Sequence, residues 1–184
     1  MSRRGVYVML VVLALPRAAA AALVDAVAVT AGINSERAPM VHMVRLSLQK
    51  YWHQHWFARG RWELTGYWEL GFGHWYGPAG MTNNDVEDID FRPVFRLQRK
   101  VSSTDTPQFY VEGGVGPALV SKTRLGPIRF STAFQFGSNF GVGVRFGPHH
   151  RYDLAYRFMH YSNADIKEPN NGISFNVLQL AVGF

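Results

Sequence analysis

FQFGSNFGVGVRF, the sequence of residues 134–146, alternates between two kinds of side chain. Phenylalanine and valine take most of the even positions, whereas the odd positions from Gln135 to Arg145 hold glycine or polar residues. Successive side chains of an extended chain point to opposite faces, so this period of two predicts a β-strand with one apolar and one polar face. The stretches 61–72, 89–98 and 109–119 alternate in the same way. We therefore expect an all-β protein.

The remaining chain also divides into strand-like stretches joined by segments rich in turn residues. An even number of strands, each about ten residues long, is what a small closed barrel requires. We predict one domain over residues 23–184, an eight-stranded antiparallel transmembrane β-barrel. The predicted strands cover residues 24–32, 40–50, 61–75, 87–98, 108–120, 131–146, 151–162 and 174–184.

Three features favour a barrel whose apolar face meets lipid and whose charges fill the lumen. The polar faces carry both signs of charge, aromatic residues gather near strand ends as in an interfacial belt, and the last strand places Phe184 in phase with Val182 and Leu180. A soluble periplasmic lipid-binding barrel with the apolar face inside stays open. The charges are Glu63, Glu69, Asp90, Arg92, Arg96, Glu112, Arg145, Asp153 and Arg157, and the aromatic residues are Tyr51, Trp52, Trp56, Phe57, Trp75 and Tyr76.

The first 22 residues have the organisation of a secretory signal peptide. Arg3 and Arg4 precede an apolar run over residues 6–15 and an alanine-rich stretch over residues 18–22. We predict that residues 1–22 form a signal peptide that directs export. The leader also holds Arg17, so three of its arginines contribute to the net charge of +6. Without a basic stripe or a recognisable module, no nucleic-acid partner is expected.

The composition also limits the chemistry of the chain. It has no cysteine, which excludes a disulfide scaffold. Each of two predicted turns holds a pair of histidines, but neither pair has a clear carboxylate partner with which to bind a metal; the pairs are His53 with His55 and His149 with His150. We expect neither a metal site nor a cofactor.

The candidate catalytic residues are His160 and Ser162. In a strand they share one face with Leu154, Tyr156 and Phe158, an apolar face on which polar groups are costly unless they find partners. A serine hydroxyl becomes a good nucleophile when a neighbouring imidazole takes its proton. The alternative is an interfacial histidine beside a turn serine.

The loop after this strand, residues 163–172, supplies the other parts that such a site needs. It holds asparagine amides and backbone N–H groups that would stabilise an oxyanion, and the two acids Asp165 and Glu168. With both termini on the periplasmic side, this loop and the one that carries Lys122, Arg124 and Arg129 face outward. These three cations are either donors for lipid phosphates or solvated loop residues.

The sequence resembles a known family at these same residues. His160-Tyr161-Ser162-Asn163-Ala164, followed by Lys167, Pro169-Asn170 and Gly172-Ile173, is similar to the PagL-type lipid A 3-O-deacylases. The likeness extends to residues 64–68, 93–95 and 112–116. It implies an outer-membrane barrel esterase of a Gram-negative bacterium that acts on lipopolysaccharide without a cofactor.

The resemblance also implies residue roles, with one departure. His160 would be the general base and Ser162 the nucleophile, while Asn163 and Asn170 would organise the oxyanion site or its loop. The family has a catalytic glutamate where this chain has Ser174. Either Glu168 or Asp165 replaces the acid, or Ser174 orients His160 by a neutral hydrogen bond.

The sequence leaves two questions about assembly and activity open. A non-catalytic barrel of the same family, with a structural or lipopolysaccharide-binding role, is the alternative function. Whether two copies associate as a homodimer is also left open.

Overall fold

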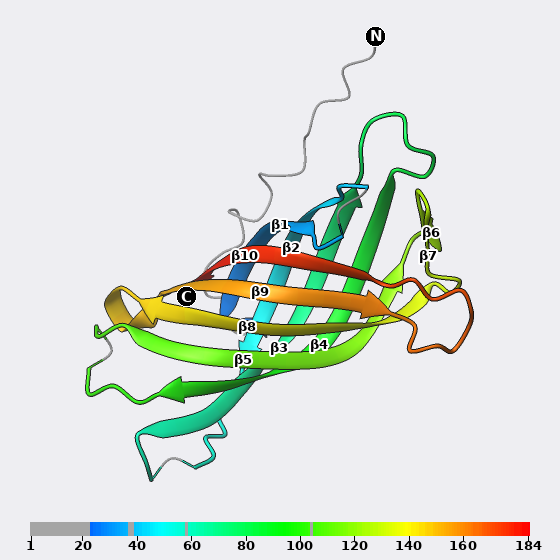
Figure 1. Ribbon diagram of the computed structural model, residues 1–184. Coiled ribbons are helices and arrows are strands. Elements are labelled where there is room, and N and C mark those ends of the chain that lie inside the picture. The colour runs from blue at the N-terminus through cyan, green and yellow to red at the C-terminus, as the bar shows by residue number, and fades with distance from the viewer. Residues whose placement is uncertain (1–22, 37–38, 58, 104) are drawn as a thin grey trace.

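The computed structural model describes residues 23–36, 39–57, 59–103 and 105–184, and the predicted signal peptide lies outside them. Eight long strands within these ranges form a closed barrel, and a two-stranded hairpin stands apart from it (Figure 1). The long strands are β1 (Ala26–Asn34), β2 (His42–Tyr51), β3 (Trp62–Tyr76), β4 (Asp85–Arg99), β5 (Gln108–Val120), β8 (Phe134–Phe146), β9 (Tyr152–Ser162) and β10 (Ile173–Gly183), and the hairpin consists of β6 (Arg124–Leu125) and β7 (Ile128–Arg129).

All neighbouring strands of the barrel run antiparallel, and the last strand pairs with the first. The register of β1 with β10 extends from the Ala26–Gly183 pair to the Asn34–Phe175 pair. The predicted eight-stranded antiparallel barrel is thus confirmed. Most strand ends differ from the predicted ones by one or two residues. The largest difference is at residues 131–133, which lie in a loop where Ser131 adopts a φ of 61° and the Thr132 N–H donates to the Phe130 carbonyl.

The apolar face of each strand points out of the barrel. On β8, Phe140 and Val142 are 63% and 48% exposed, whereas Gln135 and Asn139 are buried in the lumen. An apolar exterior suits a hydrocarbon environment, so the alternative of a soluble barrel with an apolar interior is wrong. Among the described residues, no helix is long and apolar enough to cross a membrane.

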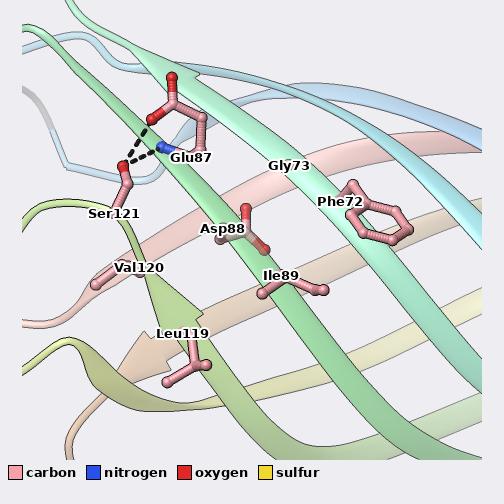
Figure 2. Close-up of a pocket in the computed structure, with 8 residues that line it drawn as sticks. All are labelled: Phe72, Gly73, Glu87, Asp88, Ile89, Leu119, Val120 and Ser121. Atoms are coloured by element: carbon pink, nitrogen blue, oxygen red, sulfur yellow. Dashed lines mark hydrogen bonds between the residues drawn. The ribbon is translucent and has the colours of Figure 1, made fainter.

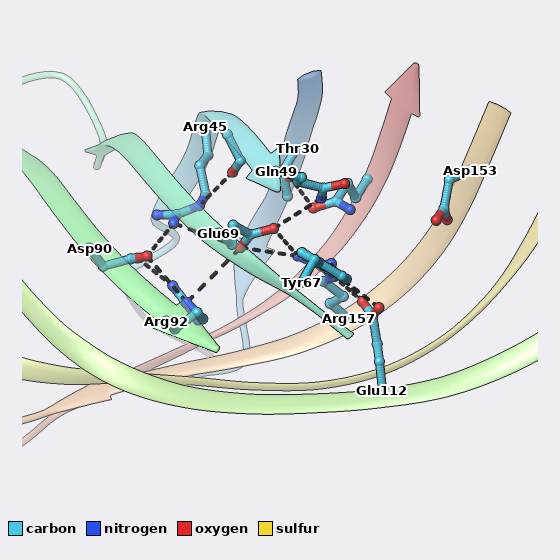
Figure 3. Close-up of polar contacts among 12 residues, drawn as sticks. Thr30, Arg45, Gln49, Tyr67, Glu69, Asp90, Arg92, Glu112, Asp153 and Arg157 are labelled. Atoms are coloured by element: carbon cyan, nitrogen blue, oxygen red, sulfur yellow. Dashed lines mark hydrogen bonds and ion pairs between the residues drawn. The ribbon is translucent and has the colours of Figure 1, made fainter. Parts of the chain in front are cut away.

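Paired charges fill the lumen (Figure 3). Arg157 lies between Glu69, at 3.0 Å, and Glu112, at 2.6 Å. Arg45 donates to Asp90 at 2.5 Å, and further buried pairs continue from there. Hydrogen-bonded ion pairs are the form in which charges tolerate burial. The lumen is therefore a packed polar core.

The half of the lumen nearest the β9–β10 loop is closed by apolar side chains. This cluster includes Trp75, Phe130, Tyr161 and Phe175, all fully buried. The prediction that Trp75 belongs to an interfacial belt is wrong, because Trp75 has the inward parity of β3 and packs against Tyr161 with ring centroids 4.7 Å apart. The cluster gives the adjoining ends of β9 and β10 a rigid support.

Candidate active site

β9 carries His160 and Ser162 on the outer wall of the barrel. The strand alternates between exposed residues such as Phe158 and buried ones such as Met159, and both candidate side chains take the outward parity. Each is half-buried between the neighbouring strands β8 and β10. The β9–β10 loop follows directly, at the end of the barrel opposite the C terminus (Figure 1). The two side chains thus lie near one rim, on the face that meets lipid.

The partner of the His160 ring comes from the neighbouring strand. Ser174 on β10 lies directly opposite His160 in the register, and His160 Nδ1 is 2.9 Å from Ser174 Oγ. When Nε2 acts as the base, Nδ1 carries the proton and donates it to this hydroxyl. Ser174, where the resemblance implies an acid, therefore contacts the imidazole.

The other ring nitrogen is available for catalysis. Among the described residues, Nε2 has no hydrogen-bond partner, and no hydrogen bond joins it to the Ser162 hydroxyl. Such bonds are often long in a free site and tighten when substrate is bound. The geometry supplies a base and a hydroxyl two residues apart on one face.

Gly172 limits the position of the His160 ring. A Cβ atom built on Gly172 would lie 3.0 Å from His160 Cε1 and 3.4 Å from Nε2, and the residue adopts a φ of 62°. Any other residue at this position would be strained and would press on the imidazole. The glycine lets the loop backbone pass close to the ring.

Tyr161 fixes the backbone between the two candidate residues, a role that the sequence analysis missed. Its ring points into the lumen, where the hydroxyl donates to Asp90 at 3.0 Å and accepts from Arg45 at 3.2 Å. A side chain held by packing and by charged partners restricts the strand on which it sits. Its inward parity in β9 is the sequence signal that could have shown this.

The asparagines hold the loop together. Asn163 is buried, and its side-chain amide donates to the carbonyls of Phe130 and Lys167, both at 2.8 Å. The Asn163 backbone N–H donates to Asn170 Oδ1 at 3.1 Å. Both residues therefore organise the loop, which is one of the two roles implied by the resemblance.

The backbone next to Ser162 has free donors. Ala164 and Asp165 adopt φ angles of 53° and 60°. Within the described chain, the N–H groups of these two residues make no hydrogen bond. Two successive unpaired N–H groups beside the Ser162 hydroxyl suit an oxyanion.

The two loop acids face other partners. The Glu168 carboxylate accepts from the Asn170 N–H at 3.2 Å, and Asp165 Oδ1 accepts from Asn170 Nδ2 at 2.9 Å. A third acid, Glu36 in the β1–β2 loop, accepts from the Ser174 N–H at 3.3 Å. Glu36 was not among the predicted site residues, and the pairing of the first and last strands of a closed barrel is the signal that could have revealed it.

A basic hollow lies between two loops at the same rim. Thr123, Arg124, Arg129, Ser131, Lys167, Glu168 and Pro169 line it. Two of the predicted phosphate contacts, Arg124 and Arg129, belong to it, whereas Lys122 pairs with Asp85 at 2.8 Å. Lys167 comes from the loop that follows Ser162, so the hollow adjoins the candidate site.

A second hollow lies on the wall formed by β3, β4 and β5 (Figure 2). Its lining is mainly apolar, and its exposed polar groups satisfy each other, because Ser121 Oγ donates to Glu87 Oε2 at 2.6 Å. It holds none of the predicted catalytic residues.

Comparisons with known proteins point to one family. A family model described as lipid A 3-O-deacylase (PagL) matches residues 42–183. The lipid A deacylase PagL of Pseudomonas aeruginosa is 33% identical over 70% of this chain and 70% of its own length. The corresponding protein of Bordetella bronchiseptica is 36% identical over 66% of this chain and 61% of its own length.

Solved structures agree with the fold. The crystal structure of the outer membrane enzyme PagL is 27% identical and matches with a TM-score of 0.75 over 86% of this chain and 99% of that chain. The crystal structure of Neisserial surface protein A is 12% identical and matches with a TM-score of 0.51 over 86% of this chain and 95% of that one, a likeness of fold alone.

Proposed function

Since this chain belongs to the PagL family of lipid A 3-O-deacylases, we propose that it hydrolyses an acyl ester of lipid A in the outer leaflet of the outer membrane, with Ser162 as nucleophile and His160 as base. The observation that carries the proposal is the outward placement of both side chains near the rim, with His160 Nδ1 already bonded to Ser174. Lipid A esters lie outside the barrel, so only an outward-facing site reaches them.

In the first half of the reaction, His160 Nε2 takes the proton of the Ser162 hydroxyl as Oγ attacks the ester carbonyl. The bond from carbonyl carbon to the sugar oxygen then breaks, and the leaving oxygen takes the proton from Nε2. In the second half, a water gives a proton to Nε2 and attacks the acyl-serine. The fatty acid leaves, and the proton returns to Ser162 Oγ.

The oxyanion that forms in both halves needs donors. The free backbone N–H groups of Ala164 and Asp165 are the candidates, since the Asn163 and Asn170 amides are engaged in holding the loop. Donors that are fixed before the reaction stabilise developing charge without reorganisation.

The basic hollow supplies affinity for the substrate's charged head group. Arg124, Arg129 and Lys167 present cationic side chains at the rim, and charge-assisted hydrogen bonds to phosphate oxygens are strong. A lipid A molecule anchored there by a phosphate would lie with its acyl chains along the apolar wall that carries His160 and Ser162.

The test is to express the chain in a Gram-negative host and weigh its lipid A. The wild type is expected to remove one hydroxyacyl group, and Ser162→Ala is expected to lower the rate by about a thousandfold or more. Ser121→Ala, an exposed serine at the same rim, is the matched control and should retain the activity. Unchanged lipid A, with wild-type protein abundant in the outer membrane, would instead favour the non-catalytic barrel.

A further inference from the structure

The geometry points to Glu36 as the acid that replaces the family's missing glutamate, acting on His160 through the Ser174 hydroxyl; this inference rests on the proposed function. Glu36 is a positioning residue in this scheme, because it touches Ser174 and not the reacting atoms. The carboxylate thus comes from the loop between the first two strands, far in sequence from His160.

The contacts place Glu36 beside the residue that orients the base. The Ser174 N–H donates to Glu36 Oε1 at 3.3 Å, while the hydroxyl of the same serine is 2.9 Å from His160 Nδ1. Ser174 therefore touches the carboxylate through its backbone and the imidazole through its side chain. No other carboxylate in the described chain is bonded to either His160 or Ser174.

Neighbouring hydrogen bonds hold the Glu36 segment in place. The Ser35 N–H donates to the Ser174 carbonyl at 2.8 Å, and Asn176 Nδ2 donates to Ser35 Oγ at 2.9 Å. Residues 35 and 36 therefore continue along β10 beyond the end of β1. The carboxylate is fixed next to Ser174 by three bonds from two successive residues.

A two-step relay needs one bond beyond these contacts, because Ser174 Oγ is bonded to His160 and Glu36 to the Ser174 backbone N–H: the Ser174 hydroxyl must also donate to the carboxylate beside it. His160 Nδ1–H donates to Ser174 Oγ, which leaves the Ser174 O–H free to donate to the Glu36 carboxylate. When Nε2 takes the proton from Ser162, the ring becomes a cation, and the carboxylate stabilises it through the polarised hydroxyl. Every relay proton stays on its own atom, and Glu36 remains ionised throughout.

The serine at position 174 explains why the acid would be supplied by a neighbouring segment. A glutamate there would contact Nδ1 directly, but serine is too short to bring a charge of its own. Its small side chain instead leaves room for a carboxylate from the β1–β2 loop, where the Ser35 N–H donates to the Ser174 carbonyl. The acid function then requires two residues, one for contact and one for charge.

The experiment compares Glu36→Gln in two backgrounds by steady-state hydrolysis of lipid A in detergent micelles. Glutamine keeps an oxygen that accepts the Ser174 N–H but removes the charge. In the Ser174 background we expect kcat to fall about tenfold with KM unchanged, since the charge acts indirectly, through the Ser174 hydroxyl, and is exposed to solvent. In a Ser174→Ala background, the same change should cost nothing more, because the relay is already broken.

Conservative and control variants separate an electrostatic role from a structural one. Glu36→Asp retains the charge and should keep more activity than Glu36→Gln. Glu87→Gln, an exposed carboxylate at the same rim that is also bonded to a serine (Figure 2), should leave kcat unchanged. Ser174→Glu brings an acid to Nδ1 directly, so in that background Glu36 should become dispensable.

The outcomes distinguish this inference from the proposed function. If wild-type protein shows no Ser162-dependent hydrolysis, both are wrong. If hydrolysis depends on Ser162 but Glu36→Gln matches wild type, only the Glu36 role is overturned. An equal loss in the Ser174 and Ser174→Ala backgrounds would also overturn it, because a loop-stabilising role does not require the hydroxyl.

Discussion

The most restricted residue around His160 is Gly172. It combines a left-handed backbone conformation with a close approach to the imidazole, so it serves the loop and the ring at once. The ring has a hydroxyl of Ser174 on one side and the Gly172 backbone on the other. His160 is therefore oriented by two small residues, and bulk added at Gly172 would displace the ring.

Gly172→Ala is expected to lower kcat by about tenfold or more, and to cost about 1–2 kcal/mol of unfolding free energy. The added methyl would press on Cε1 and move Nε2 away from Ser162. The measurement is kcat on lipid A together with the thermal midpoint of unfolding. Gly60→Ala, where an added Cβ meets no atom within 4 Å, is the control. An unchanged kcat for Gly172→Ala would show that the ring position is set elsewhere.

At the scale of the element, the outward positions of β9 carry the candidate catalytic residues, and an inward position between them anchors the strand. Its outward residues at the rim are His160 and Ser162, and the inward residue between them is Tyr161, which packs on Trp75 and bonds to Asp90 and Arg45. A shift of the strand by one residue would exchange the two sets. The inward anchor therefore protects the register on which the outward pair depends.

Tyr161→Phe is expected to destabilise the barrel by about 1–3 kcal/mol, because the hydroxyl's buried charged partners lose a hydrogen bond. Tyr156→Phe, which removes an outward hydroxyl of the same strand that is bonded to Asn176 on β10, is the control with a smaller effect. Urea unfolding in lipid vesicles measures both. Equal stability of the two variants would contradict the anchoring role of Tyr161.

The strands could be predicted from sequence because a barrel imposes a period of two on every strand. The same period placed His160 and Ser162 on one face. The placement of Trp75 was wrong because the general preference of aromatic residues for interfaces was given more weight than the inward parity of this residue in β3. Parity is the stronger signal in a barrel, since a strand cannot turn one side chain outward alone.

The contacts between strands could not be predicted in this way. The Ser174–His160 bond depends on the exact register of β9 with β10, and the Glu36 contact depends on the closure of the barrel by β1. Neither appears in the periodicity of one segment. The loop bonds of Asn163 and Asn170 likewise depend on where the chain turns between β9 and β10.

At the scale of the whole molecule, the barrel is a solid support for a site on its surface. The lumen is packed with ion pairs in one half and with apolar side chains in the other, so neither half serves as a route for substrate (Figure 3). Under the proposed function, substrate would approach from the membrane, along the apolar exterior. The interior charges thus contribute rigidity, and their removal should affect stability more than substrate binding.

Arg157→Met tests this division, because Arg157 lies between Glu69 and Glu112 and its loss leaves carboxylates buried with fewer partners. We expect a loss of about 3–5 kcal/mol in the free energy of unfolding, since breaking a buried pair strands a charge. Lys50→Met, which breaks the half-buried pair with Asp25, should cost less than about 1 kcal/mol. Both are measured by urea unfolding in lipid vesicles.

The double variant Arg157→Met with Glu112→Gln separates a stranded charge from lost packing. If uncompensated charge causes the instability, neutralising Glu112 should recover part of the stability that Arg157→Met removes. Its remaining partner Arg96 limits that recovery, because Arg96 lies 2.9 Å from the same carboxylate and would itself lose an ion pair. If no stability is recovered, the loss is due to packing. KM for lipid A should stay at its wild-type value in every folded variant, because the candidate site lies on the opposite side of the barrel wall.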